Sequence, residues 1–430
     1  MPHAQRPVRA ASQEVDRAFL GMPVVLLAGY IAVILCMTGD GIEQAFLSKY
    51  LVGLGFSAQH ASLVFTVYGL SAALSAWLSG VLAEIYTPRR VMLFGIAWWL
   101  VFHALFLQFG LSRVNLPLSL LFYGIRGFAY PLFFYGFFVW VVQLSPPAKL
   151  ASAIGWVWGM FTIGYGIVGS YLPSFTIPRF GFLPTLWMSM AWVAAGGVCV
   201  LFMRAPNIRS VAGRKGGSKL AEMSKGLTLI FEDRNIGLAL ITRVICNLSL
   251  FGFPVIMPLY YTSSAVGFTT AQWIRIWGTF FLIQPLTNIL WGLIGDHVGW
   301  MRQMRWVGFT GCGTATLLFY FLPAHFGSNF PIAVFAALFF ALTITSFVPM
   351  GAIFPAMAPN HKGAAISVQN LGGGLANFCG PALATILLPY GGTRTVVLAY
   401  AALYFVAAGL TCIIRVEQPR GIRSVAIAMH

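Results

Sequence analysis

The chain has 430 residues, of which 59% are hydrophobic and only 8% are charged, and its mean hydropathy is +0.82. Soluble globular proteins carry about 25% charged residues, so this composition excludes a soluble protein. Lys and Arg outnumber Asp and Glu by 26 to 10, for a net charge of +16. In a membrane protein such an excess marks the cytoplasmic side, so we expect an all-α protein of the lipid bilayer that binds no nucleic acid.

Apolar runs of helical length recur along the whole chain, and each is long enough to cross a bilayer. Twelve transmembrane helices are predicted, at 19–54, 58–83, 91–111, 116–144, 151–172, 182–203, 236–262, 270–294, 306–322, 330–357, 363–388 and 395–414. The charged N-terminal tail contains no short apolar run that ends in a cleavage site, so we expect the first helix to be retained.

The cations between these segments fall almost entirely on one side of the membrane. By the positive-inside rule this side is cytoplasmic and holds both chain ends. The predicted organisation is a cytoplasmic tail at 1–18, a six-helix bundle at 19–203, a basic cytoplasmic linker at 204–235, a second six-helix bundle at 236–414, and a cytoplasmic tail at 415–430.

Several short patterns recur near one offset, which indicates two homologous halves. Gly55-Phe56 with Gln59 returns as Gly267-Phe268 with Gln272, an offset of 267 minus 55, or 212 residues. Gly80-Val-Leu-Ala-Glu84 before Arg89-Arg90 returns as Gly292-Leu-Ile-Gly-Asp296 before Arg302, again at 212. Two pseudo-symmetric bundles are typical of secondary transporters.

The second of these patterns resembles the cytoplasmic loop signature of the major facilitator superfamily. The motif residues are Gly80, Glu84, Arg89 and Arg90 in the first copy and Gly292, Asp296, Gly299 and Arg302 in the second. Thr87 stands where the first copy usually has glycine. With Gly39-Asp-Gly-Ile-Glu43 and the following Phe46-Leu-Ser, the chain resembles the polyol permease branch, which carries ribitol and D-arabinitol. The resemblance implies two bundles around a central cavity that opens alternately to either side.

Three charged side chains lie deep within apolar segments. Asp40 and Glu43 have an i, i+3 spacing, which on a helix puts both carboxylates on one face. Arg126 lies about ten residues into the fourth segment, on the order of 15 Å deep, level with Asp40. Since buried charges cost much less in pairs, we expect Arg126 to pair with Asp40 or Glu43.

Sugar porters of the superfamily have an acidic residue on the first helix and an arginine on the fourth, and both take part in proton coupling. The resemblance therefore implies a proton-coupling role for Asp40 and Arg126, and Glu43 shares their face. A static ion pair that pins two helices is the alternative. His103 could relay protons or simply bond to a neighbouring helix, and Arg243 is expected to reach the polar end of its own helix.

The offset of 212 carries Asp40 to Gly252 and Arg126 to Leu338, so the second half lacks these charges. It offers neutral side chains instead. Amides both donate and accept hydrogen bonds, which suits a polyhydroxylated ligand, and an indole can cover its C–H face. The candidate substrate-binding residues are Asn247, Gln284, Asn288, Trp291, Gln369, Asn370 and Asn377. Interhelical hydrogen bonding is an equal alternative for any one of them.

These observations predict a proton-coupled symporter that imports a sugar alcohol such as ribitol, D-arabinitol, mannitol or sorbitol. We expect it to act as a monomer in the bacterial inner membrane, with a proton gradient and no cofactor or metal. A carrier of sugars or of organic acids such as dicarboxylates, and a nontransporting sensor of the same fold, remain alternatives. No metal-ligand or catalytic pattern such as His-Glu-x-x-His indicates an enzyme.

Overall fold

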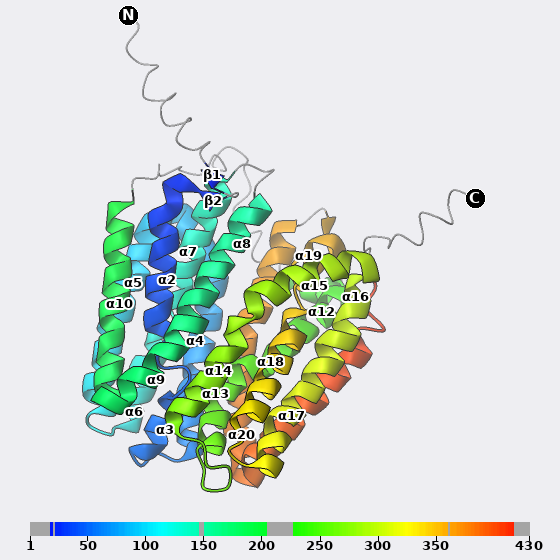
Figure 1. Cartoon of the computed structure of the whole chain (residues 1–430). Helices are drawn as coiled ribbons and strands as arrows, with labels where there is room; N and C mark the ends of the chain where they lie inside the picture. Colours follow the sequence, from blue (N-terminus) through cyan, green and yellow to red (C-terminus); the bar gives the residue numbers. More distant parts are fainter. Residues whose placement is uncertain (1–17, 20–21, 146–149, 204–226, 360–361, 417–430) are drawn as a thin grey trace, which may run out of the picture.

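The computed structural model describes residues 18–19, 22–145, 150–203, 227–359 and 362–416. These residues are almost entirely helical (Figure 1). The first half comprises β1 (Ala18–Phe19), β2 (Met22–Pro23), the 3-10 turn η1 (Val24–Leu26), α2 (Leu27–Gly41), α3 (Leu47–Gly53), α4 (Ala58–Tyr86), α5 (Pro88–Leu105), the π-helix η2 (Phe106–Leu111), α6 (Leu116–Arg126), α7 (Ala129–Leu144), α8 (Leu150–Phe161), the π-helix η4 (Thr162–Val168), α9 (Gly169–Phe180) and α10 (Phe182–Phe202).

The second half repeats this plan. It comprises α12 (Arg234–Ile245), α13 (Leu248–Tyr261), α14 (Thr270–Leu282), α15 (Gln284–Val298), α16 (Trp300–Gln303), the π-helix η6 (Met304–Thr310), α17 (Gly311–Phe326), α18 (Phe330–Thr345), α19 (Met350–Met357) and α20 (Lys362–Leu410). Helix α20 is interrupted at Gly391 and Gly392, where the backbone leaves helical values, so its two arms match the last two predicted segments.

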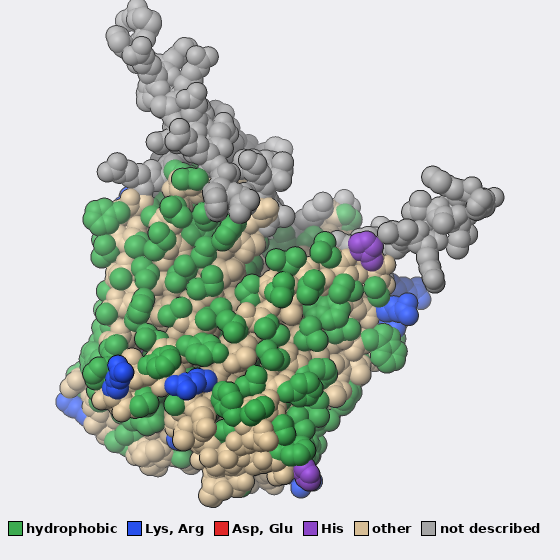
Figure 2. Space-filling model, viewed as in Figure 1, with side chains coloured by type: hydrophobic (Ala, Val, Ile, Leu, Met, Phe, Trp, Pro, Cys, Tyr) green, Lys and Arg blue, Asp and Glu red, His purple; other side chains and the backbone are tan. Residues whose placement is uncertain are grey.

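The described residues form 11 helical stretches long and apolar enough to cross a membrane, with the interrupted α20 counted once. On the face drawn in Figure 2, apolar side chains (green) are spread over both halves, and charged ones are few. Helix α15, for example, exposes Leu286, Ile289 and Leu293 at 60% or more. Such faces are stable against lipid tails rather than water, so the chain is a multi-pass integral membrane protein.

Four of the predicted segments are not continuous helices. The first, fourth, seventh and tenth each divide near the middle, between α2 and α3, α6 and α7, α12 and α13, and α18 and α19. The expectation that one helical face carries both Asp40 and Glu43 is therefore wrong in detail, since α2 ends at Gly41 and Glu43 lies in the turn that follows. Interrupted helices are tolerated at membrane depth where protein surrounds the freed backbone groups.

The internal repeat is also visible in the backbone. Gly55 and Gly267 have φ values of 102° and 88°, and Ser57 and Thr269 cap the helices that follow by accepting a backbone hydrogen bond three residues ahead. Thr87 and Gly299 end equivalent helices with φ values of 77° and 97°. Each pair is separated by 212 residues, so the repeated sequence folds into repeated structure.

Among the described residues, the hydrogen bonds between the halves cluster toward one end of the molecule. We call it the α3 end, after the helix at the bottom of Figure 1, and the opposite end, with β1 and β2, the β1 end. Helix α4 packs along α20, and α9 along α14. Near the α3 end, Lys49 Nζ donates to Thr270 Oγ1 at 2.8 Å, and Trp273 Nε1 donates to the Ala45 carbonyl at 2.6 Å. Ser62 Oγ donates to the Pro381 carbonyl at 2.9 Å. The hydroxyls of Tyr171 and Thr279 form a hydrogen bond of 2.9 Å. The halves are thus joined across this end.

The loop motifs are described only in part. The side chains of Gly80, Glu84 and Asp296 lie outside the described residues, so their predicted roles stay predictions. Arg89 donates to the Leu201 carbonyl at the end of α10, whereas Arg90 and Arg302 are exposed. The linker at 204–226 and both tails beyond 18 and 416 also lie outside the description.

Candidate functional site

The buried charges meet at two helix breaks. Asp40 lies in the last turn of α2 and Glu43 in the turn after it, while Arg126 is the last residue of α6. Gly41 allows the close packing, since a Cβ there would lie 2.3 Å from the Tyr165 carbonyl oxygen. Gly127 likewise follows Arg126 and lies against the Tyr68 carbonyl. The two interrupted helices therefore direct three charged side chains at one another.

Arg126 pairs more closely with Glu43 than with Asp40. Nη1 donates to Glu43 Oε2 at 2.9 Å, and Nη2 contacts Oε1. Tyr123 also donates to Oε1 at 2.7 Å. Arg126 is fully buried and Glu43 is 1% exposed, so this two-point pair offsets the cost of removing both charges from water. The expected ion pair is present, with Glu43 as the main partner.

Asp40 has a different environment. Its Oδ1 accepts a hydrogen bond from Trp99 Nε1 at 2.7 Å, and the Tyr68 hydroxyl donates to the same carboxylate. Arg126 Nη2 approaches Oδ1 only to 3.9 Å. Dipolar neighbours thus hold Asp40, and the guanidinium contributes at longer range. Because one guanidinium faces two carboxylates, the fully ionised cluster carries an excess negative charge.

His103 completes the cluster, and its protonation follows from its neighbours. Nδ1 contacts Arg126 Nη1, and because arginine can only donate, Nδ1 must be the acceptor. The ring proton therefore lies on Nε2, which is 3.0 Å from Ser189 Oγ and 3.2 Å from the Leu186 carbonyl. The fully buried His103 is thus a neutral imidazole that orients the guanidinium. The sequence left this role open between relay and packing.

Aromatic rings enclose the guanidinium. The carbon Cζ of Arg126 lies 4.4 Å from the ring centre of Tyr123, 5.0 Å from that of Trp99 and 5.4 Å from that of Tyr68. Ring faces attract cations, and this attraction strengthens when water is excluded. Sequence reasoning missed these three residues, because isolated aromatic residues in an apolar helix are indistinguishable from core packing. Their spacing relative to Arg126 gives no signal until the helices are placed.

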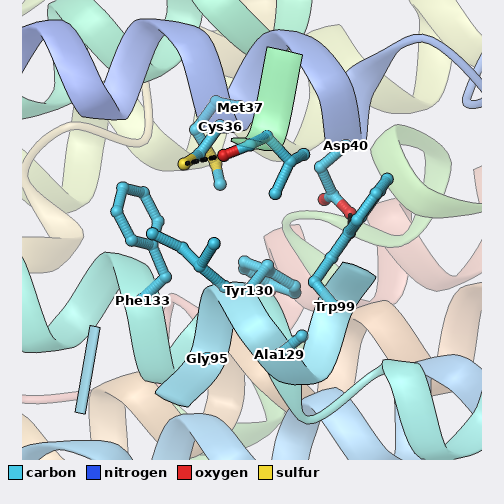
Figure 3. Close-up of a pocket in the computed structure, with 10 residues that line it drawn as sticks. Cys36, Met37, Asp40, Gly95, Trp99, Ala129, Tyr130 and Phe133 are labelled. Atoms are coloured by element: carbon cyan, nitrogen blue, oxygen red, sulfur yellow. Dashed lines mark hydrogen bonds between the residues drawn. The ribbon is translucent and has the colours of Figure 1, made fainter. Parts of the chain in front are cut away.

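A small cavity reaches Asp40 from within the first half (Figure 3). Its lining includes Cys36, Met37, Trp99, Tyr130 and Phe133, and the Asp40 carboxylate points toward Trp99. Tyr130 also reaches the other half, because its side chain hydrogen-bonds with Asn377 of α20. Tyr130 thus borders the cavity beside Asp40 and also contacts the second half.

The predicted amides lie on several helices of the second half. Asn377 lies at the boundary between the halves, where it bonds to Tyr130. Asn247 lies at the break between α12 and α13, and the Gln369 amide faces Gly351 of α19. Trp291 donates to the Leu342 carbonyl of α18 at 2.7 Å, so its N–H is occupied. Gln284, Asn288 and Asn370 are partly buried. Their role in substrate binding stays a prediction.

Comparisons with known proteins agree with this architecture. The Major Facilitator Superfamily sequence family matches residues 29–274 and 239–427. Over 94% of this chain and 95% of each relative, the sequence is 48% identical to a ribitol transporter and 49% identical to a D-arabinitol transporter, both of Klebsiella pneumoniae. It is 35% identical to an alpha-ketoglutarate permease of Bacillus subtilis, over 93% of this chain and 91% of that protein.

Solved structures show the same fold. The crystal structure of a nucleoside transporter superposes with a TM-score of 0.71 at 16% sequence identity. The superposition covers 91% of this chain and 99% of that structure. A peptide-bound transporter of the POT family gives a TM-score of 0.69 at 17% identity, over 92% of this chain and 96% of that structure. These proteins are transporters and not enzymes. The family match and the identity to the two polyol transporters show that the chain belongs to the Major Facilitator Superfamily of membrane transporters.

Proposed function

We propose that the protein is a proton-coupled symporter that imports a sugar alcohol by alternating access. The observation that carries the substrate class is the 48–49% identity to the ribitol and D-arabinitol transporters, against 35% to the alpha-ketoglutarate permease. The identity extends over 94% of the chain and therefore includes both halves. A five- or six-carbon polyol is the substrate class it favours.

The charge balance of the buried cluster supports proton coupling. Asp40, Glu43 and Arg126 sum to one excess negative charge when both acids are ionised, and His103 is neutral. A buried uncompensated charge is expensive, so the site suits one exchangeable proton. Glu43 is already neutralised by Arg126, whereas Asp40 borders the cavity. Asp40 is therefore the proposed proton carrier.

The substrate is proposed to bind between the halves, beside this cavity. Tyr130 and Asn377 meet there from opposite halves and offer neutral donors and acceptors. The acidic cluster behind Tyr130 would repel a dicarboxylate, which argues against the organic-acid alternative. A proton on Asp40 would alter the hydrogen bonds of Tyr68 and Trp99, and Tyr68 stacks at 6.4 Å on Tyr130. This contact is the proposed link between protonation and substrate binding.

The clustered bonds at the α3 end support alternating access. A state joined across that end admits substrate from the β1 end, and the positive-inside rule assigns the β1 end to the cytoplasm. The structure would then correspond to the substrate-releasing side of the cycle. Opening of the α3 end would require the loss of the bonds made by Lys49, Ser62 and Tyr171. We also propose that the protein acts as a monomer and lies in the bacterial inner membrane.

Flux in proteoliposomes tests the function directly. Purified protein should accumulate labelled ribitol or D-arabinitol when the vesicle interior is alkaline, and accumulation should stop when a protonophore removes the gradient. Unlabelled polyols should compete, while dicarboxylates should not. Binding of polyol without flux would identify a sensor, and uptake of dicarboxylate alone would reverse the substrate assignment.

A further inference from the structure

We propose that Arg243 forms a second substrate-binding element, which binds two neighbouring hydroxyl groups of the polyol at the boundary between the halves. The inference rests on the proposed function and adds a cationic contact to it. Arg243 lies in the last turn of α12, at the break in the seventh segment. Arg126 ends α6 at the break in the fourth segment, so the two arginines occupy comparable places.

The side chain of Arg243 does not extend to the end of its helix as the sequence suggested. It lies along Gly372 and Gly373 of α20, where an added Cβ would be 2.7 Å from Arg243 Cγ and 3.0 Å from Nη2, respectively. Gly374, the next residue, touches Ala73 of α4, since its Cβ would lie 2.7 Å from the Ala73 Cα. The glycines thus make room for Arg243 beside the line where the halves meet.

One edge of the guanidinium is unused by the described residues. Nη1 donates to Cys246 Sγ at 3.1 Å, a weak acceptor. Nε is buried without a hydrogen-bond partner, and no ion pair of Arg243 is recorded among the described residues. Nε and Nη2 present parallel donors, the arrangement with which arginine binds two oxygen atoms at once. A buried unpaired donor is costly, so a ligand that satisfies it would gain affinity.

The first half places tyrosines in the neighbourhood of this guanidinium. Tyr135 of α7 lies within range of the electrostatic influence of Arg243, and Tyr130 lies near Tyr135 on the same helix. Tyr130 in turn reaches Asn377, one turn of α20 beyond Gly373, and borders the Asp40 cavity. On α7, Tyr130 therefore lies beside the Asp40 cavity and Asn377, and Tyr135 lies within electrostatic range of Arg243. Hydroxyls suit these groups better than a carboxylate, because tyrosine hydroxyls and the amide donate and accept, and the Asp40 cluster disfavours an anion.

Kinetic constants of exchange test this site. Arg243→Gln should raise the KM for ribitol by about tenfold or more while the maximal rate changes by less than about twofold, the pattern of lost substrate binding. Arg243→Lys keeps the charge but not the paired donors and should restore little affinity. Gly373→Ala should raise KM without altering any charge, because its Cβ displaces Nη2. Arg305→Gln, whose guanidinium bonds to Thr411 in the second half, is the control and should leave KM unchanged.

Several outcomes would overturn the inference. An unchanged KM in Arg243→Gln, or full rescue by Arg243→Lys, would remove the paired contact. If Arg243→Gln lowers both the maximal rate and the melting temperature but leaves KM unchanged, Arg243 is a structural residue. Preference of the wild type for a sugar acid over the matching polyol, abolished in Arg243→Gln, would refute hydroxyl binding. Absence of polyol exchange in the wild type would instead refute the proposed function, so the two failures are distinguishable.

Discussion

Both terminal nitrogens of the Arg126 guanidinium contact the carboxylate of Glu43, one oxygen each. Asp40, three residues before Glu43, accepts hydrogen bonds from Trp99 and Tyr68, and its Oδ1 lies 3.9 Å from Nη2 of the same guanidinium. The two acids therefore have different surroundings although they are neighbours in sequence. Glu43 neutralises a buried cation, and Asp40 is the acid that we propose exchanges the proton.

Removal of the Glu43 charge should destabilise the protein. Glu43→Gln leaves Arg126 buried without its counter-ion, and loss of one partner of a buried pair costs about 3–5 kcal/mol. Asp40→Asn keeps the bond from Trp99 and should cost much less. Melting temperatures of both variants in detergent measure the difference. Equal melting temperatures would show that the two acids share the pairing with Arg126.

Removal of the Asp40 charge should instead uncouple transport. Asp40→Asn preserves the shape of the side chain, so polyol binding and counterflow exchange should continue, because neither needs net proton movement. Uphill accumulation driven by a pH gradient should vanish. Both activities are measured in proteoliposomes, with Glu43→Gln as the matched variant. Accumulation retained by Asp40→Asn but lost in a Glu43→Gln variant that still exchanges polyol would move the proton to Glu43. Retention of accumulation in both variants would leave the acids as an anchor for Arg126.

His103 should act through its acceptor nitrogen. The substitution His103→Asn can place an amide oxygen near the position of Nδ1, whereas His103→Leu fills the space without an acceptor. Hydrogen bonds to charged groups contribute about 1.5–3 kcal/mol, so His103→Leu should reduce gradient-driven accumulation about tenfold or more. His103→Asn should remain close to wild type. The pH profile of accumulation is the second readout, and identical profiles for both variants would assign His103 to packing.

The backbone at Thr87 should be strained. Its φ of 77° and ψ of 139° lie in a region that side chains with a Cβ rarely adopt, and Gly299 holds the same conformation in the second half. Thr87→Gly should therefore stabilise the protein, and Gly299→Thr should destabilise it, each by about 1–3 kcal/mol. Thermal unfolding of the two variants against wild type checks the signs. A destabilised Thr87→Gly would show that the threonine side chain makes contacts worth more than the strain.

The joined α3 end should depend on glycine contacts between the halves. A Cβ at Gly69 would lie 2.3 Å from the Asn377 carbonyl oxygen, and one at Gly278 would lie 2.8 Å from the Tyr171 ring. Gly69→Val and Gly278→Val should therefore favour states in which this end is separated. Distances between spin labels on the two halves should lengthen at the α3 end. Gly53→Ala, which meets nothing within 4 Å, is the control, and unchanged distances in both valine variants would contradict the prediction.

The sequence by itself determined the membrane class, the positions of the apolar segments and the duplication. These features are local or periodic: hydropathy acts over a segment of about 20 residues, and homologous halves keep their turn glycines and caps at one offset. The presence of an ion pair was also predictable, because three charges within apolar helices at one depth need partners. The resemblance to the polyol permeases came from the same local motifs.

Only the tertiary structure decided which charges pair and what surrounds them. Because the helices break after Gly41 and Arg126, Glu43 faces the guanidinium, and Asp40 accepts a hydrogen bond from Trp99 instead. Helical periodicity in the sequence does not predict such a break. His103 and Tyr123 join the cluster from α5 and α6, and Arg243 reaches the boundary because Gly372 and Gly373 lack side chains. Contacts between residues far apart in sequence depend on how helices pack, and packing is set by the sum of many weak van der Waals contacts that no single segment encodes.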